Sequence, residues 1–448
     1  MKCTYRGVGG FFQKYFKGKK WTERSKDIHN AIKSRHVDGR WSDFPDPPLQ
    51  DAVSKWLFRF QDEFLADAQG VYYTSSSTGD FTGAEGPRQL DLFIKRKSET
   101  EGIKHHWKDV HVIGEHKQSK DGPKSLLLQL SRYTRDVFTA QPTRRFVHGF
   151  FLHRTLMELW VFDRSSPYSS GSFDIHENPN QFIQAIAGYA IIDDEELGLD
   201  TFVKRDREDQ FISIIQDATG KEKRLQLERE PIVIQRAIVC RGTSYYRSMD
   251  LKYVVKFSWT SDKWPPEADH LRLAREKGVK GVASLLGHRQ ISSVEEMRKG
   301  LTFPDPHHFR TASQNTSFSQ SQSQSVSRSF GPFRGLSIVE GSLGKRKSVD
   351  NEAKKRKRLR SNSQKSKLDK QHEAKEAMTR AQTTSLFASN NVSFENRLFC
   401  CLAISPAGEA ISKFSKSFWP RSEIQSRRTS LCIYRGKFFI GTSQRIIS

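Results

Sequence analysis

A long polar segment from Phe303 to Ala388 is the feature that most constrains what this chain can fold into. It is rich in Ser and Gln from Ser313 to Ser329, and between Gly344 and Lys370 it carries twelve Lys or Arg against three Asp or Glu. A stretch with so few apolar residues cannot bury a core. We therefore expect it to be a disordered insert, and we expect the folded parts to be built from the chain on either side.

Two basic clusters in this insert have the composition of a nuclear import signal or of a patch that binds nucleic acid. The alternative is a run of charge that is merely solvated. The clusters consist of Lys345, Arg346 and Lys347, and of Lys354, Lys355, Arg356, Lys357 and Arg358. The rest of the net charge of +23 is spread along the chain, which favours a polyanionic partner such as nucleic acid.

The N-terminus and the cysteines indicate the compartment. Met1 to Gly10 lacks the apolar core of a signal peptide, and no apolar run reaches membrane-spanning length. The five cysteines show no disulfide or metal-ligand spacing, which is typical of a reducing environment. We expect a soluble intracellular protein, nuclear or cytoplasmic, with no membrane partner.

A single lysine interrupts an apolar strand pattern in the middle of the chain. Tyr253 to Phe257 is β-branched or aromatic apart from Lys256, and an amine there is costly to bury unless an anion meets it. Glu267 opens a segment of helical spacing eleven residues later. A strand lysine followed by a helix glutamate is the order of the ion pair that grips the ATP phosphates in protein kinases. The alternative is an edge strand whose lysine is solvated.

Several separated motifs resemble those of the fungal-type protein kinase family, in the same order along the chain. The resemblance extends from about Phe11 to Phe414, with the insert as an interruption. The segments that carry it are Gln141 to Phe146, Trp160 to Arg164, Arg241 to Thr243, Val254 to Lys256, Asn396 to Leu398 and Ile404 to Gly408.

The resemblance implies ATP-dependent phosphorylation of Ser or Thr in a protein substrate, with ATP and Mg²⁺ as cofactors. Lys256 would hold the phosphates and Glu267 would brace Lys256. Gly242 and Thr243 would line the lid over ATP, in a stretch from Ile238 to Tyr246 that predicts strand, turn and strand but contains one glycine.

Upstream, the predicted elements follow the order of a restriction-endonuclease-like core. A leading helix is followed by strand, strand, helix, strand and strand, and then by a Ser/Gly loop from Ser165 to Phe173. The elements are expected at Leu49 to Ala68, Gln89 to Ile94, Trp107 to Lys117, Leu126 to Phe138, Arg145 to Leu152 and Thr155 to Asp163.

That second resemblance implies a metal-dependent chemistry on phosphodiesters. Asp91 and Glu115 would bind Mg²⁺ and Lys117 would orient the attacking water, since residues two apart on a strand face the same side. Gln129 and Tyr133, one helical turn apart, resemble an element of a nuclease subgroup. Glu63 could add a ligand, whereas the alternative is an exposed strand with a Glu115–Lys117 salt bridge.

The acids that complete a kinase site do not follow. Phosphoryl transfer needs an Asp for the substrate proton and an Asn and an Asp for the metals, but no His-Arg-Asp or Asp-Phe-Gly sequence occurs after Ile404. Back-translation of Leu431 to Ile447, shifted by one nucleotide, permits a His-Arg-Asp loop with a following Asn. We therefore expect truncation of the kinase by a frameshift after about Phe414, and weak or no kinase activity.

The predicted fold class is α+β with several domains: a restriction-endonuclease-like α/β core plus an incomplete protein-kinase-like small lobe. The first function is that of a fungal-type protein kinase relative, and the alternatives are a nuclease-like or nucleic-acid-binding protein and a nuclear interaction protein. The expected parts are 1–48, a basic peripheral helical arm; 49–230, the nuclease-like domain; 231–302, the first part of the small lobe; 303–388, the insert; 389–414, the hinge strand; and 415–448, an unstructured tail.

Overall fold

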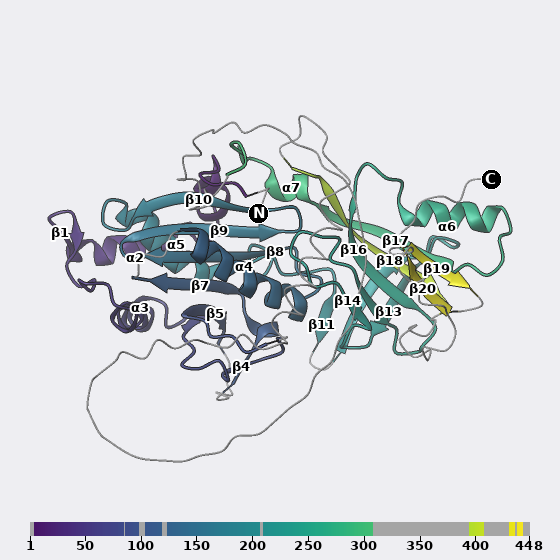
Figure 1. Ribbon diagram of the computed structural model, residues 1–448, viewed down its shortest axis with the longest axis horizontal. Coiled ribbons are helices and arrows are strands. Elements are labelled where there is room, and N and C mark those ends of the chain that lie inside the picture. The colour runs from purple at the N-terminus through teal and green to yellow at the C-terminus, as the bar shows by residue number, and fades with distance from the viewer. Residues whose placement is uncertain are drawn as a thin grey trace, which may run out of the picture. The chain divides into compact units, whose positions relative to one another are not determined.

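The computed structural model describes residues 4–84, 86–97, 104–118, 123–206, 209–307 and 394–406, and the backbone of 430–434 and 437–441. Helices and several β-sheets are mixed in these ranges, which confirms the α+β class (Figure 1). Both basic clusters and most of the predicted insert lie outside the described residues. None of the described helices is long and apolar enough to cross a membrane.

A six-stranded sheet in the order β10-β9-β8-β7-β5-β3 forms the first body of the chain. β7 and β8 are parallel and are joined by α4, while the other neighbours are antiparallel. This is the predicted order of strand, strand, helix, strand and strand. The bounds are β3 (Gly70–Tyr73), β5 (Leu92–Arg96), β7 (Val112–Lys117), α4 (Pro123–Ala140), β8 (Phe146–His153), β9 (Leu156–Asp163) and β10 (Pro167–Asp174).

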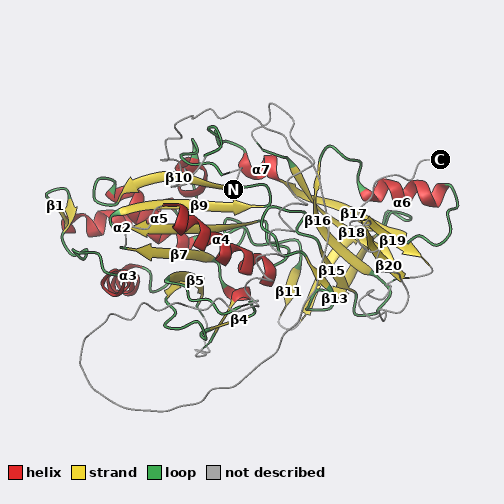
Figure 2. Cartoon of the chain, viewed as in Figure 1, coloured by secondary structure: helices red, strands yellow, loops and turns green. Residues whose placement is uncertain are grey.

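Helices cover both faces of this sheet, and the side chains alternate between the two cores (Figure 2). Phe93 packs on the α4 side, whereas its neighbours Leu92 and Ile94 pack on the side of four other helices. Those four are α1 (Phe11–Phe16), α2 (Thr22–Ile32), α3 (Gln50–Phe64) and α5 (Pro179–Ile191). The short elements around them are η1 (Lys33–Arg35), β1 (His36–Val37), β2 (Arg40–Trp41), β4 (Phe81–Thr82), β6 (His105–His106) and η2 (Trp107–Asp109).

The N-terminal segment belongs to this body and does not lie at its periphery as predicted. Phe11, Phe16 and Trp21 are buried in the same core as α5 and the sheet. The backbone of Tyr5 also exchanges hydrogen bonds with β10, through Pro167 O at 3.1 Å and Ser169 N at 3.0 Å. The basic residues of the segment hide this role in the sequence, because they sit between aromatic residues that face inward.

The segment from Ser165 to Phe173, predicted to be a loop, is largely strand β10. It pairs with β9 and has a bulge between Ser169 and Ser172. Serine and glycine are poor strand formers, but hydrogen bonds to β9 on one side and to Tyr5 on the other satisfy this backbone. Tertiary pairing thus overrides the local propensity.

A five-stranded antiparallel sheet in the order β14-β15-β16-β18-β17 forms the second body. β18, which follows the undescribed residues 308–393, pairs between β16 and β17, so chain from both sides of the insert builds one sheet. The bounds are β14 (Val233–Ile234), β15 (Ser244–Arg247), β16 (Val254–Ser261), α6 (Glu267–Glu276), β17 (Ser284–Ser293), α7 (Val294–Arg298) and β18 (Arg397–Ser405).

Each face of this sheet has its own core. One face packs on a three-stranded sheet of β11 (Lys204–Asp206), β12 (Asp209–Ile215) and β13 (Glu222–Leu227), with Phe257 and Trp259 at its centre. The other face packs on α6 through Ala268, together with Val254 and Leu402. The strand predicted at Ile238 to Cys240 is wrong. These residues form a bend, in which Cys240 Sγ donates to the carbonyl of Ala237 at 2.8 Å.

The C-terminal segment carries a short hairpin. β19 (Ser430–Tyr434) pairs antiparallel with β20 (Lys437–Gly441), in a region for which we predicted no structure. Both strands are short runs of β-branched, aromatic or other apolar residues, a composition that favours strands locally. The frameshift stays a prediction.

Candidate functional site

Lys256 lies at the centre of the second sheet, on the face that packs against α6. In the strand ladder its neighbours are Tyr245 on β15 and Leu402 on β18. The lysine is 7% exposed, so its amine is not solvated as an edge-strand lysine would be. Its Nζ forms an ion pair and hydrogen bond with Glu267, and it lies 5.9 Å from the centre of the Tyr245 ring.

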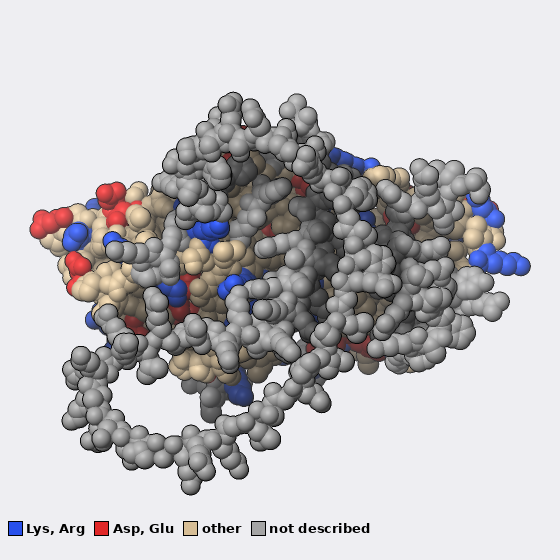
Figure 3. Space-filling view, in the orientation of Figure 1, with Lys and Arg blue, Asp and Glu red and all other residues tan. Residues whose placement is uncertain are grey.

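The start of α6 places Glu267 against this amine. Pro265 and Pro266 precede the helix and favour its start at Glu267, the first helical residue. Acids lie in the first turn of α6 and Arg275 in its last, which complements the helix dipole. The basic side chains at the α6 end of the molecule are visible at the right of Figure 3. Glu267 is therefore held at the positive end of the helix, facing a cation.

The environment of Lys256 keeps the amine charged. Burial lowers the pKa of an amine, but the carboxylate of Glu267 and the nearby Tyr245 outweigh it, so the pKa of Lys256 is raised. Burying a cation is costly unless it is paired, and Glu267 supplies that pairing. The structure thus brings Lys256 and Glu267 together, and it adds Tyr245, which the sequence did not single out.

The turn at Gly242 is engaged with the protein itself. The amide of Gly242 donates to Cys240 Sγ at 3.2 Å and the amide of Thr243 to Gln235 Oε1 at 3.3 Å. Gly242 has a φ of 52°, and a Cβ there would meet the Arg164 guanidinium at 2.8 Å. Its assignment to an ATP lid stays a prediction, and the contact with Arg164 is one that sequence reasoning missed.

A second cluster brings together five residues singled out from the sequence. Lys117 Nζ lies 2.7 Å from Glu115 Oε1 and 3.3 Å from Asp91 Oδ2. The Tyr133 hydroxyl lies 3.2 Å from Glu115 Oε2 and accepts from Gln129 Nε2 at 2.7 Å. Asp91 lies immediately before β5, Glu115 and Lys117 lie on β7, and Gln129 and Tyr133 lie on α4. The spacing of two on β7 and of four on α4 thus has the predicted effect.

Glu115 is fully buried in this cluster and has an altered acidity. Burial, followed by the charge of Asp91, raises the pKa of Glu115 to about 8, while Lys117 opposes the shift. Glu63 lies elsewhere, paired with Arg35. Within the described ranges, no group of three or more His, Cys, Asp or Glu is arranged to hold a metal ion. Any cation here would have two carboxylates from the protein.

Comparison with known proteins identifies one similarity. The model of a family described as fungal protein kinase matches residues 89–418, which include the Lys256–Glu267 pair and the cluster around Asp91. No curated protein and no solved structure matches the chain.

Proposed function

We propose a nucleotide-binding role for Lys256 and Glu267, from the premise that the chain belongs to the fungal protein kinase family. The observation that carries the proposal is the buried amine of Lys256, paired with the first residue of α6. Kinases use a strand lysine and a helix glutamate in this way to hold ATP. Lys256 would contact the phosphates, Glu267 would fix its position, and Tyr245 would support it from β15.

Catalysis needs more than this grip. Mg²⁺ and the proton of a Ser or Thr substrate require an Asp and further metal ligands, and the expected motifs do not occur after Ile404. We therefore propose that the chain binds ATP or ADP and transfers phosphate to protein weakly or not at all. A radiolabelled phosphate assay checks this, because robust transfer that is abolished in Lys256→Met contradicts it.

Calorimetric titration with ADP tests the binding itself. Lys256→Met should weaken binding about 10- to 100-fold, since it removes a charge-assisted contact to phosphate. The control is Lys252→Met, at an exposed lysine in the turn before β16, which should bind like the native chain. Unchanged affinity in Lys256→Met, or no binding of ADP by the native chain, rejects the proposal.

The Asp91 cluster favours a second candidate function, a metal-dependent activity on phosphodiesters in a restriction-endonuclease-like body. Two carboxylates fit Mg²⁺, which is often bound by one or two carboxylates and by the phosphates of its substrate. Asp91 and Glu115 would hold the ion, and it would supply charge stabilisation at phosphorus. Lys117, within reach of both carboxylates, would orient the attacking water.

Cleavage of single- and double-stranded DNA and RNA in Mg²⁺ tests this candidate. Cleavage that is lost in Glu115→Gln and kept in Glu195→Gln, an acid outside the cluster, supports it. Equal cleavage by both variants points to a contaminating nuclease, and absence of cleavage by the native chain removes the candidate. The third hypothesis is a nuclear interaction protein that acts through the Ser/Gln-rich and basic insert, most of which lies outside the residues that the structure describes.

A further inference from the structure

Two adjacent charged residues at the end of β9 are fully buried, although the functions proposed above do not use them. Asp163 is the last residue of β9, and Arg164 follows it. Both belong to the Trp160 to Arg164 motif that resembles the family, yet neither lies in the Lys256 site or in the Asp91 cluster. Burying two such groups is costly unless each finds partners, so their partners identify what they do.

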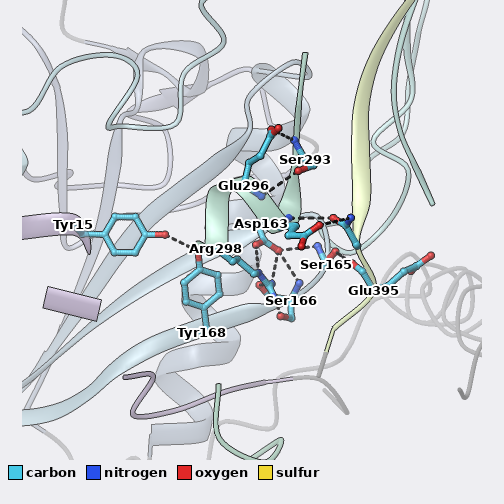
Figure 4. Close-up of polar contacts among 11 residues, drawn as sticks. Tyr15, Asp163, Ser165, Ser166, Tyr168, Ser293, Glu296, Arg298 and Glu395 are labelled. Atoms are coloured by element: carbon cyan, nitrogen blue, oxygen red, sulfur yellow. Dashed lines mark hydrogen bonds and ion pairs between the residues drawn. The ribbon is translucent and has the colours of Figure 1, made fainter. Parts of the chain in front are cut away.

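Asp163 binds the end of the helix that follows β17. Arg298, the last residue of α7, donates from Nε and Nη2 to the two carboxylate oxygens, each at 2.8 Å (Figure 4). The carboxylate also accepts from the amides of Ser165 and Ser166 at 2.8 and 2.9 Å. A bidentate pair with these additional donors is the arrangement in which a buried ion pair is satisfied.

Arg298 in turn contacts the described residues on both sides of 308–393. Its guanidinium lies 4.7 Å from the ring of Phe303, 4.3 Å from that of Phe394 and 4.9 Å from that of Tyr168. Next to Phe394, the carbonyl of Glu395 accepts from the Ser165 hydroxyl at 2.7 Å. The start of β18, and with it the strand beside Lys256, is thereby tied to the end of β9.

Arg164 contacts the segment that leads into β15, on the other side of the five-stranded sheet that carries Lys256. Its guanidinium lies 3.8 Å from the Phe138 ring and donates to the carbonyl of Ala237 at 2.9 Å. It also lies under the turn at Gly242, where an added Cβ would be 2.8 Å from its atoms. This turn leads directly into β15, which carries Tyr245 opposite Lys256.

We propose that Asp163 and Arg164 are positioning residues, which fix both halves of the Lys256 sheet to the α/β body. Asp163 holds α7 and the start of β18, and Arg164 holds the turn before β15. The α/β body is then an obligatory part of the nucleotide-binding unit and not a separate module. The link to nucleotide binding rests on the function proposed above, whereas the joint itself does not depend on it.

Hydrogen exchange of the full chain, read by mass spectrometry, tests the joint. Arg164→Lys should speed exchange in residues 244–247 about tenfold or more, and Asp163→Asn should do so in 397–405, while 112–117 keep their native rates. The control is Arg154→Met, at an exposed arginine in the turn before β9, which should leave all three segments unchanged. Native rates at 244–247 in Arg164→Lys and at 397–405 in Asp163→Asn overturn the proposal.

Milder variants keep the test decisive if those proteins unfold. Ser165→Ala removes the hydrogen bond to Glu395, and Gly242→Ala adds a Cβ against Arg164 at a backbone φ of 52° that favours glycine. Each should speed exchange several-fold in its own segment, 397–405 or 244–247, and not in the other. Exchange that changes equally in both segments, or in neither, contradicts a joint with two separate contacts.

The affinity for ADP separates positioning from structure alone. In variants that stay folded, faster local exchange should be accompanied by about 5- to 10-fold weaker binding of ADP, and Arg154→Met should bind normally. Faster exchange with native affinity refutes the positioning role. If the native chain binds no ADP, the proposed function fails, and the exchange measurements alone decide whether the joint exists.

Discussion

At the scale of single residues, this protein buries several cations, each satisfied in a different way. Lys256 meets a carboxylate, Arg298 meets a carboxylate and three aromatic rings, and Arg144 donates to backbone carbonyls. The Arg144 guanidinium bonds the carbonyls of Val110, His111, Phe146 and Leu197, and burial lowers its pKa to about 9. Burial of a cation therefore does not by itself mark a functional site in this chain.

A buried histidine leads to a prediction about pH. His148 is enclosed by the rings of Tyr15 and Tyr189, and burial lowers its pKa to about 3. Between pH 6.5 and 3 the unfolded chain binds a proton here that the folded chain does not, so this residue reduces stability as pH falls. Between pH 7 and 4.5, the free energy of unfolding should fall by about 2 kcal/mol less in His148→Gln than in the native chain.

Urea unfolding at several pH values measures this difference. The exposed His270 on α6 gives the control, because His270→Asn should follow the native curve. Parallel curves for His148→Gln and the native chain show that His148 does not carry the effect.

At the scale of elements, the short helix α7 is stabilised by its N-terminal cap. The Ser293 hydroxyl accepts from the amide of Glu296 at 3.1 Å, and the Glu296 carboxylate accepts from the amide of Ser293 at 2.8 Å. This reciprocal capping box satisfies two amides that a helix start leaves free. Figure 4 shows both contacts at the start of the helix that ends at Arg298.

Removing this cap should destabilise the protein. Ser293→Ala should cost about 1 kcal/mol in the free energy of unfolding, because the amide of Glu296 loses its side-chain acceptor. Glu296→Gln keeps an acceptor for the Ser293 amide and should cost less than about 0.5 kcal/mol. Chemical denaturation compares the two, and equal costs would show that the hydroxyl contact is unimportant.

At the scale of the whole molecule, the ends of the described chain around residues 308–393 are held together. The rings of Phe303 and Phe394 are 5.5 Å apart, so the segment between them leaves and re-enters the body at one place. Because loop-closure entropy grows slowly with length, the length of this segment contributes little to stability.

Replacing residues 310–389 by a ten-residue Gly/Ser linker should therefore leave the melting temperature within about 2 °C of the native value. Differential scanning calorimetry checks this. The same replacement in Arg298→Met, which removes the cation that neutralises the buried Asp163, should melt far lower. A drop of more than about 5 °C in the linker variant alone would mean that the segment supports the fold.

The linker variant also tests the basic clusters. If they bind nucleic acid, the full chain should bind DNA with an affinity that falls steeply as salt rises, and the linker variant should lose most of this dependence. Fluorescence anisotropy at several salt concentrations measures the slopes. Identical slopes would assign DNA binding, if present, to the rest of the chain.

Sequence patterns predicted the elements that depend on local periodicity. Leu127, Leu130 and Val137 recur at helical spacing and lie inward on α4, and Glu115 and Lys117 lie together because a strand has a period of two. The patterns failed at β10 and at Ile238 to Cys240, where contacts distant in sequence decide the backbone. They also gave no sign that Tyr245 would lie opposite Lys256, since strand register depends on pairing.

The sequence by itself determined the order of the elements, the pairing of Lys256 with Glu267 and the family, because these depend on short spacings and on motifs. Only the tertiary structure decided that the N-terminal segment is part of a core and that Asp163 and Arg164 hold the Lys256 sheet. The physical reason is that burial removes water as a partner for charged side chains. A charge that water would satisfy in an extended chain must, once enclosed, bind whatever the fold brings beside it.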